Sequence, residues 1–217
     1  MKKYLFLLFI LFVNCHVVFS QTTSNNSMLY YFSQQPDSIY PYLSSNNKLD
    51  LVDFIAADMD AVVVNKLDGN TKLEVVDSTF IKLQLNPATL VEMKLLPTTI
   101  NLKDSSKYVI SVLTTYGVNA KESTISFYTS KWNKCNVHNP LKDIRINDLF
   151  DKSKTANGKD VKKIMKIPEY FLLHASFDEG NSLLLKLSTN KLLEEDNNSF
   201  KAILGEKRLF WNGRSFK

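Results

Sequence analysis

The sequence predicts an α+β fold, a curved antiparallel β-meander of about eight or nine strands with two helices packed on one face. Three observations lead to this prediction. A segment with helical periodicity, Asn46 to Met59, precedes the strands. Short runs of alternating or β-branched residues follow it, and their short connections favour antiparallel neighbours. A second helix is expected at Glu194 to Leu204, before a closing strand.

The first twenty residues, Met1 to Ser20, are typical of a secretory signal peptide. Two lysines precede the apolar run Tyr4 to Val13, and Val18 and Ser20 are small enough for the signal peptidase site. We therefore expect export to the periplasm or the extracellular space. Gln21 to Ser27 is polar and is expected to be a disordered new N-terminus.

The segment Asn46 to Met59 carries the one clear amphipathic helix of the first half. Leu49, Val52, Ala56 and Met59 fall on one stripe, which we expect to face the core. Serine side chains just before the segment provide oxygens for an N-cap.

The strands are expected to follow this helix almost without interruption, in nine runs separated by turn residues. These runs are 61–64, 72–76, 80–85, 90–96, 107–116, 122–132, 170–177, 182–188 and 208–216. Asp68-Gly69 is expected to supply two residues with positive φ for the first hairpin turn. In 90–96, Val91, Met93 and Leu95 alternate with Glu92 and Lys94, which predicts one apolar and one polar face.

The segment Asn133 to Pro168 interrupts the strands. It contains two weak helical patches, Ile146 to Phe150 and Asp160 to Met165, and several lysines. Those lysines could form an anion-binding or membrane-surface patch. A solvated connector is the favoured interpretation, because most charged runs are simply exposed.

Length and charge restrict the classes of protein that are possible. Cleavage after Ser20 would leave 197 of the 217 residues, enough for one domain with a sizeable core. Losing Lys2 and Lys3 lowers the net charge from +5 to +3, and only three of the 27 basic residues are arginine. We therefore expect no nucleic-acid partner. No later segment is long and apolar enough to predict a transmembrane helix in the mature chain.

Motifs for catalysis or cofactor binding are weak. The six glycines fall at breaks between elements, so none is left for a phosphate-binding loop, and we expect no cofactor. Cys135, the one cysteine after cleavage, rules out an intramolecular disulfide. Cys135 with His138 or His174 could serve a hydrolase, although a half-buried structural thiol is the more common role.

Two sets of side chains are candidates for ligand or partner binding. Five aspartates around the first helix could hold a cation, namely Asp37, Asp50, Asp53, Asp58 and Asp60, and the first three are the candidate binding residues. A solvated acidic helix face is favoured, because the spacing matches no calcium loop, and we expect no metal. Trp132 and Trp211 could line a ligand groove, although most aromatic residues must serve the core.

The chain resembles a family of secreted Bacteroidota proteins known as domain of unknown function 3256. The motifs that carry the resemblance are distributed over nearly the whole mature chain. They are Pro36-Asp37-Ser38, Pro41-Tyr42-Leu43, Asn47-Lys48-Leu49-Asp50 with Asp53-Phe54, the hairpin Ala61 to Gly69, Leu95-Leu96-Pro97, Ser126-Phe127-Tyr128 with Trp132, and Trp211-Asn212-Gly213 with Phe216. The resemblance implies export and an α+β domain, and it implies no activity.

These observations favour a non-enzymatic protein of the cell envelope that binds an apolar ligand or a protein partner. A curved sheet with a helix over its concave side could hold an acyl chain, by analogy of architecture alone. The alternatives are a hydrolase with an acidic or Cys-His site, which predicts a deep pocket with titratable groups, and a structural interaction module, which predicts an exposed apolar patch.

Overall fold

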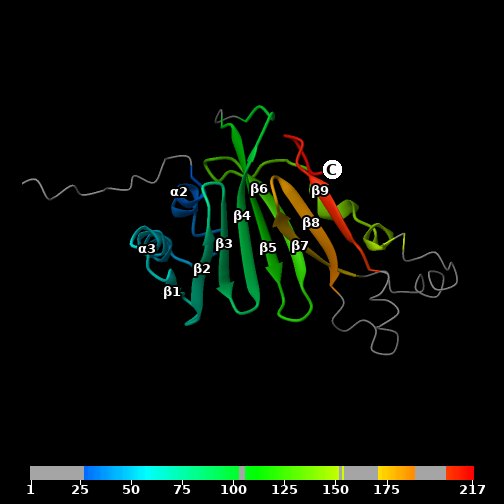
Figure 1. The fold of residues 1–217 in the computed structure, drawn as a ribbon. Helices are drawn as coiled ribbons and strands as arrows, with labels where there is room; N and C mark the ends of the chain where they lie inside the picture. The colour runs from blue at the N-terminus through cyan, green and yellow to red at the C-terminus, as the bar shows by residue number, and fades with distance from the viewer. Residues whose placement is uncertain (1–26, 103–105, 152, 154–170, 189–203) are drawn as a thin grey trace, which may run out of the picture.

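The computed structural model describes residues 27–102, 106–151, 153, 171–188 and 204–217. Over these residues the chain forms nine strands in two antiparallel sheets, with two α-helices and two short 3-10 helices (Figure 1). The predicted α+β fold with an antiparallel meander is therefore confirmed. The strands divide into a six-stranded and a three-stranded sheet, which the sequence pattern did not indicate.

The six-stranded sheet follows the order of the chain, and each strand pairs with the next. Its strands are β1 (Val62–Val64), β2 (Asn70–Val76), β3 (Phe80–Asn86), β4 (Thr89–Pro97), β5 (Tyr108–Tyr116) and β6 (Glu122–Tyr128). The connections explain this order, since the longest, between β4 and β5, has ten residues and a parallel crossover needs about a dozen or more. The β1–β2 turn differs from expectation, because only Asp68 has positive φ and the side chain of Asn65 accepts hydrogen bonds from the N–H groups of Leu67 and Gly69.

The three-stranded sheet consists of β7 (Leu172–Asp178), β8 (Ser182–Ser188) and β9 (Glu206–Phe210). Two 3-10 helices, η1 (Pro140–Asp143) and η2 (Ile146–Leu149), precede it in the chain. β9 is shorter than the predicted closing strand. After it, Trp211 and Phe216 form a β-bridge across the turn at Asn212 and Gly213.

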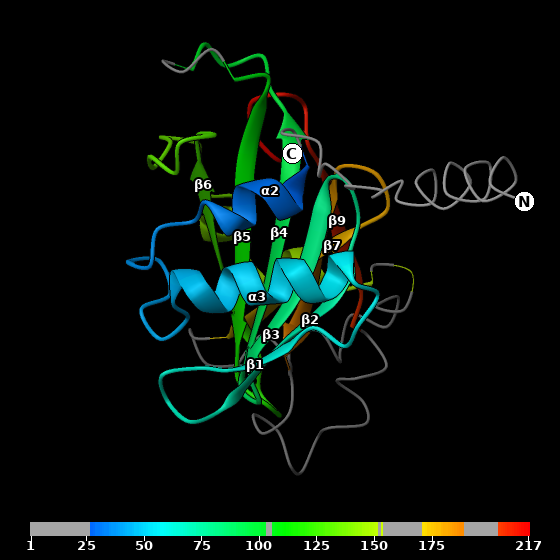
Figure 2. The same ribbon diagram turned by 90° about the vertical axis from the view of Figure 1, so that its left-hand side faces the viewer.

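The six-stranded sheet separates two hydrophobic cores, and β4 shows how. Met93 packs with Phe32 and Leu51 in the core under the helices. Leu96, on the opposite face of the strand, packs with Leu183 in the core between the two sheets. Figures 1 and 2 show the resulting layers, with the helices on one side of the large sheet and β7–β9 on the other.

Helix α3 (Ser45–Ala56) confirms the predicted helix, with an end three residues earlier than expected. Ser44 is its N-cap and forms a capping box with Asn47. The predicted inward stripe is wrong at both ends, because Leu49 is 48% and Met59 58% exposed. Leu51 and Lys48 are the buried residues of the helix.

Helix α2 (Met28–Ser33) was not predicted. Its six residues are too few to show a helical period, yet Met28 and Phe32 are fully buried against the large sheet. Ser27, expected to be part of a disordered N-terminus, is the N-cap and accepts a hydrogen bond from the N–H of Tyr30. α2 and α3 together cover one face of the sheet (Figure 2), whereas the second helix predicted for that face, 194–204, lies mostly outside the described residues.

Several predictions fall outside the described residues. They are the signal peptide, residues 21–26, the helical patch at 160–165 and most of the helix predicted at 194–204. Leu204 is described, and it forms a β-bridge with Phe150. None of the described helices is long and apolar enough to cross a membrane.

Candidate functional site

A groove of about 640 Å³ lies at the end of the large sheet where β4 and β6 finish. Two loops form it, the segment after β4 and the segment after β6, and we call it the loop groove. Its apolar wall is made by Ile100, Leu102, Cys135 and Val137. This volume is in the range of small-molecule sites.

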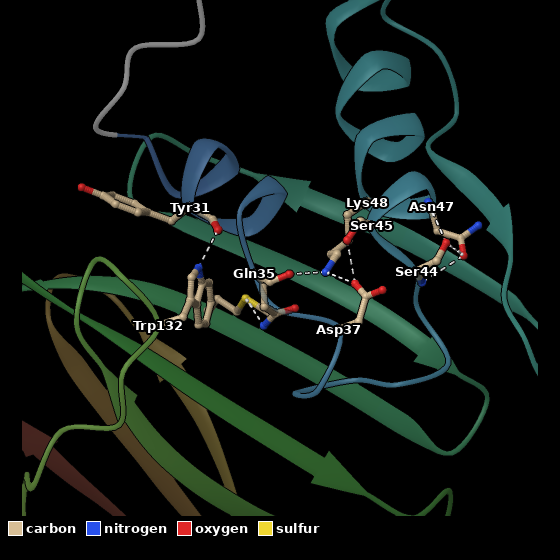
Figure 3. A network of polar contacts seen from close by, with 9 residues as sticks. Tyr31, Gln35, Asp37, Ser44, Ser45, Asn47, Lys48 and Trp132 are labelled. Carbon is tan, nitrogen blue, oxygen red and sulfur yellow. Dashed lines mark hydrogen bonds and ion pairs between the residues drawn. The ribbon is translucent and has the colours of Figure 1, made fainter.

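The loop after β6 is held in one conformation by backbone hydrogen bonds. Thr129 N–H donates to the Asn133 carbonyl (2.9 Å), and Cys135 N–H donates to the Phe127 carbonyl (2.8 Å). Trp132 has a φ of 60°, a left-handed conformation that is unfavourable for a bulky side chain. Its indole N–H donates to the Tyr31 carbonyl of α2 at 2.9 Å, and this bond and its burial hold the loop against the helix (Figure 3).

The C-terminal turn supports the other loop of the groove. Thr99 N–H and the Thr98 hydroxyl both donate to the carbonyl of Gly213, at 3.0 and 2.9 Å. Gly213 has a φ of +92°, and a Cβ there would approach the Thr99 side chain to 3.3 Å, so glycine suits this turn. The indole N–H of Trp211 donates to the Pro97 carbonyl at 2.6 Å.

Two lysines, Lys131 and Lys134, line the loop groove together with its apolar wall. Both are exposed, and neither forms an ion pair with the residues that the structure describes. The described part of the lining contains no carboxylate. The groove therefore combines an apolar wall with positive charge.

A second hollow, of about 420 Å³, lies beside the first and shares Lys131 with it. Tyr30, Tyr31 and Gln34 of α2 and its C-cap line one side, and Trp132 lines the other. We call it the aromatic hollow. Trp132, predicted as a binding residue, is 7% exposed and contributes to this lining.

Trp211, the second predicted aromatic binding residue, is packed among other aromatic rings. It stacks on Phe127 with 6.0 Å between ring centroids and meets Phe216 edge to face at 5.3 Å. Its described contacts stabilise the C-terminal turn, so a binding role stays a prediction.

The three predicted acidic residues do not share one arrangement in the structure. Asp37 accepts hydrogen bonds from the Lys48 ammonium at 2.9 Å and from the Ser45 hydroxyl at 2.8 Å (Figure 3). These bonds, chiefly that of Lys48, lower the pKa of Asp37 to about 2. Asp50 and Asp53 are exposed on α3. Within the described chain, no three His, Cys, Asp or Glu side chains are placed to hold a metal ion.

Lys48 explains why the predicted helix stripe was wrong. Its side chain is 1% exposed, and its ammonium donates both to Asp37 and to the carbonyl of Gln35 (Figure 3). A buried ammonium with two oxygen partners is stable enough to face the core. The helix consequently turns Lys48 and Leu51 inward.

Histidine does not join Cys135 in the described lining of the loop groove. His138 is exposed and pairs with Asp143 at 2.5 Å. His174 lies on β7 opposite Lys186, and burial, with the neighbouring lysines, lowers its pKa. The Cys-His pair considered from the sequence is therefore not assembled at this groove.

Glu92 and Lys94 form a buried polar cluster that sequence reasoning missed. Both lie on the β4 face that was expected to be polar and outward, but β7 and its turn cover that face. Lys94 donates to the carbonyls of Asp178 and Gly180 and lies near the Phe80 and Phe177 rings. Burial raises the pKa of Glu92 to about 7.

Comparison with known proteins identifies the family. Residues 20–216 match the family described as "Protein of unknown function (DUF3256)". The chain belongs to this family. It is also similar in structure to a domain of an uncharacterised protein from Porphyromonas gingivalis W83, with a TM-score of 0.66 and 22% identity over 87% of this chain and 96% of that one. At this identity the likeness shows the fold alone. A search of curated proteins gave no match.

Proposed function

We propose that the protein is exported to the cell envelope and binds an apolar ligand in the loop groove without transforming it. The signal-peptide pattern of residues 1–20 supports export. The observation that carries the binding proposal is the groove of about 640 Å³ with its wall of Ile100, Leu102, Cys135 and Val137.

The face of the sheet under the helices is a poor alternative site. Phe32, Leu51 and Met93 fill it and are fully buried, so an acyl chain would have to displace the core there. The loop groove is open without any such displacement. A ligand site at the loops of a rigid sheet is also common among binding proteins.

The chemistry of the groove favours binding over catalysis. Its described lining contains Cys135 but no carboxylate and no histidine, whereas a catalytic thiol is activated by an adjacent general base. The loops are held by backbone hydrogen bonds and by the two tryptophan N–H donors. A preformed apolar groove binds with little loss of conformational freedom.

The proposal is tested with Nile red, an uncharged dye that fluoresces in apolar sites. Val137→Trp, which places a bulky ring in the groove, should weaken binding to the mature protein by about tenfold. Val75→Trp, at a 43% exposed position on β2, is the matched control and should bind within about twofold of the parent. Equal affinity in the parent and in both variants would place the dye elsewhere and refute the assignment.

A further inference from the structure

The loop groove carries charge that an uncharged ligand would not use. Lys131 and Lys134 stand three residues apart on the loop after β6 and line the groove beside its apolar wall. The backbone of this loop is fixed by the Thr129–Asn133 bond and by a β-bridge between Tyr128 and Lys134. The backbone that carries both lysines is therefore held in one position at the rim of the groove.

Two other lysines of the large sheet are paired with carboxylates. Lys72 pairs with Asp60 and Lys82 with Glu74. Lys131 and Lys134 have no such partner among the described residues. A flexible lysine at an apolar rim can keep its stem against the wall while its ammonium meets an anion in water.

The neighbouring aromatic hollow adds a second surface at the same rim. Lys131 lines both the loop groove and the aromatic hollow. Tyr30 and Trp132 line the aromatic hollow with it. Aromatic rings with a polar edge and lysine side chains suit the boundary between an apolar chain and its polar head. The apolar wall of the loop groove lies on one side of this boundary.

We propose that the ligand of the loop groove is a monomeric amphiphile, an acyl chain with an anionic head group. The chain lies along Ile100, Leu102 and Val137, and the head group lies between the ammonium groups of Lys131 and Lys134. This assignment rests on the proposed binding function and names the class of ligand. Charge complementarity and the apolar wall of one groove carry it.

The test compares dodecanoate with dodecanol, which share a chain and differ in the charge of the head. Both are titrated into the mature protein at pH 8 by displacement of Nile red. Dodecanoate should bind about tenfold more tightly than the alcohol. The double variant Lys131→Glu with Lys134→Glu should lose most of that preference while its affinity for dodecanol stays within about twofold.

Lys66→Glu, which makes half of the charge change of the double variant at a distant position, is the control. Lys66 is exposed and lies in the β1–β2 turn, at the opposite end of the sheet from the groove (Figure 1). The Lys66→Glu variant should retain the preference of the parent protein for dodecanoate over dodecanol. A loss of preference in Lys66→Glu that is half or more of the loss in the double variant would be a general charge effect and would overturn the head-group assignment.

The remaining outcomes separate the two proposals. Equal binding of acid and alcohol, with both weakened by Val137→Trp, would keep the binding function and overturn the anionic class. Binding of neither, together with a Nile red signal that Val137→Trp leaves unchanged, would refute the binding function itself. Binding to vesicles of anionic phospholipid without binding of monomeric dodecanoate would identify a membrane surface and overturn the inference.

Discussion

Replacing Glu92 by glutamine should make the protein more stable at neutral and alkaline pH. Glu92 is 6% exposed, lies between the two sheets and has its pKa raised from 4.5 to about 7, chiefly by burial. The groups that face it are Lys82 on β3, Lys94 on β4 and the N–H of Phe177 on β7, and all three favour its ionised form. Burial raises the pKa of Glu92 by more than these three groups lower it.

The magnitude follows from the pKa change. The folded protein keeps the proton of Glu92 up to about pH 7, whereas the unfolded chain loses it near 4.5. The contribution of Glu92 to the free energy of unfolding is therefore largest below pH 4.5. It falls as the pH rises to about 7 and is constant above that value. The change from 4.5 to 7 corresponds to about 3 kcal/mol of lost stability at pH 8.

The assay is urea unfolding of the parent and Glu92→Gln at pH values from 4.5 to 8. Glutamine keeps the shape and can accept the Phe177 N–H, but it cannot ionise. The variant should gain up to about 3 kcal/mol relative to the parent across this range. His174, whose lowered pKa acts in the opposite direction below pH 6.5, cancels in the difference.

Glu122→Gln, at an exposed glutamate on β6, is the control and should show no such gain. If the difference in free energy of unfolding between the parent and Glu92→Gln were the same at pH 4.5 and at pH 8, Glu92 would not be a buried group that ionises in this range.

Three further substitutions test how the layers are joined. Ser123→Ala removes the hydroxyl that accepts from the buried N–H of Ala175 at 2.9 Å, and urea unfolding should show a loss of about 2 kcal/mol; no loss would mean that water replaces the hydroxyl. Trp132→Phe removes the hydrogen bond to the carbonyl of Tyr31, so its free energy of unfolding should fall by about 1 kcal/mol, and an unchanged value would contradict a role for that bond. The Asp37→Asn variant should lose less stability than the parent between pH 4 and pH 2, because the pKa of Asp37 is lowered from 3.8 to about 2. Equal losses of unfolding free energy in the two proteins over this range would argue against the ion pair.

The strands were predictable because their signal is local. Alternating, β-branched and apolar runs located every strand of the described chain; β8 has the predicted bounds, whereas β9 ends six residues before the predicted closing strand. The division into two sheets was not predictable, since β7 follows a long connector and nothing local indicates which face it covers. Glu92 and Lys94 illustrate the consequence, because their polar pattern fits a solvated face and only the second sheet buries them.

Helices were harder to predict where burial depends on distant partners. Lys48 is buried because Asp37 and the Gln35 carbonyl accept its hydrogen bonds, and no periodicity of α3 contains that information. The helix α2 has too few residues to display a period.

The candidate site was only partly predictable. Trp132 was singled out as an aromatic residue near a strand end, and it lines the aromatic hollow. The loop groove itself needs Ile100 and Val137, which are 37 positions apart and belong to loops without a motif. The C-terminal turn that supports it comes from yet another part of the chain. Only the folded sheet brings these segments together.

Native mass spectrometry of the protein purified from its own host would show whether the loop groove retains a ligand. We expect an added small mass that leaves on denaturation and is identified as an acyl amphiphile with an anionic head group. We also expect that Val137→Trp, expressed in the same host, carries less of this mass than Val75→Trp. A protein that shows only its own chain mass in all three forms would contradict a retained ligand in the loop groove.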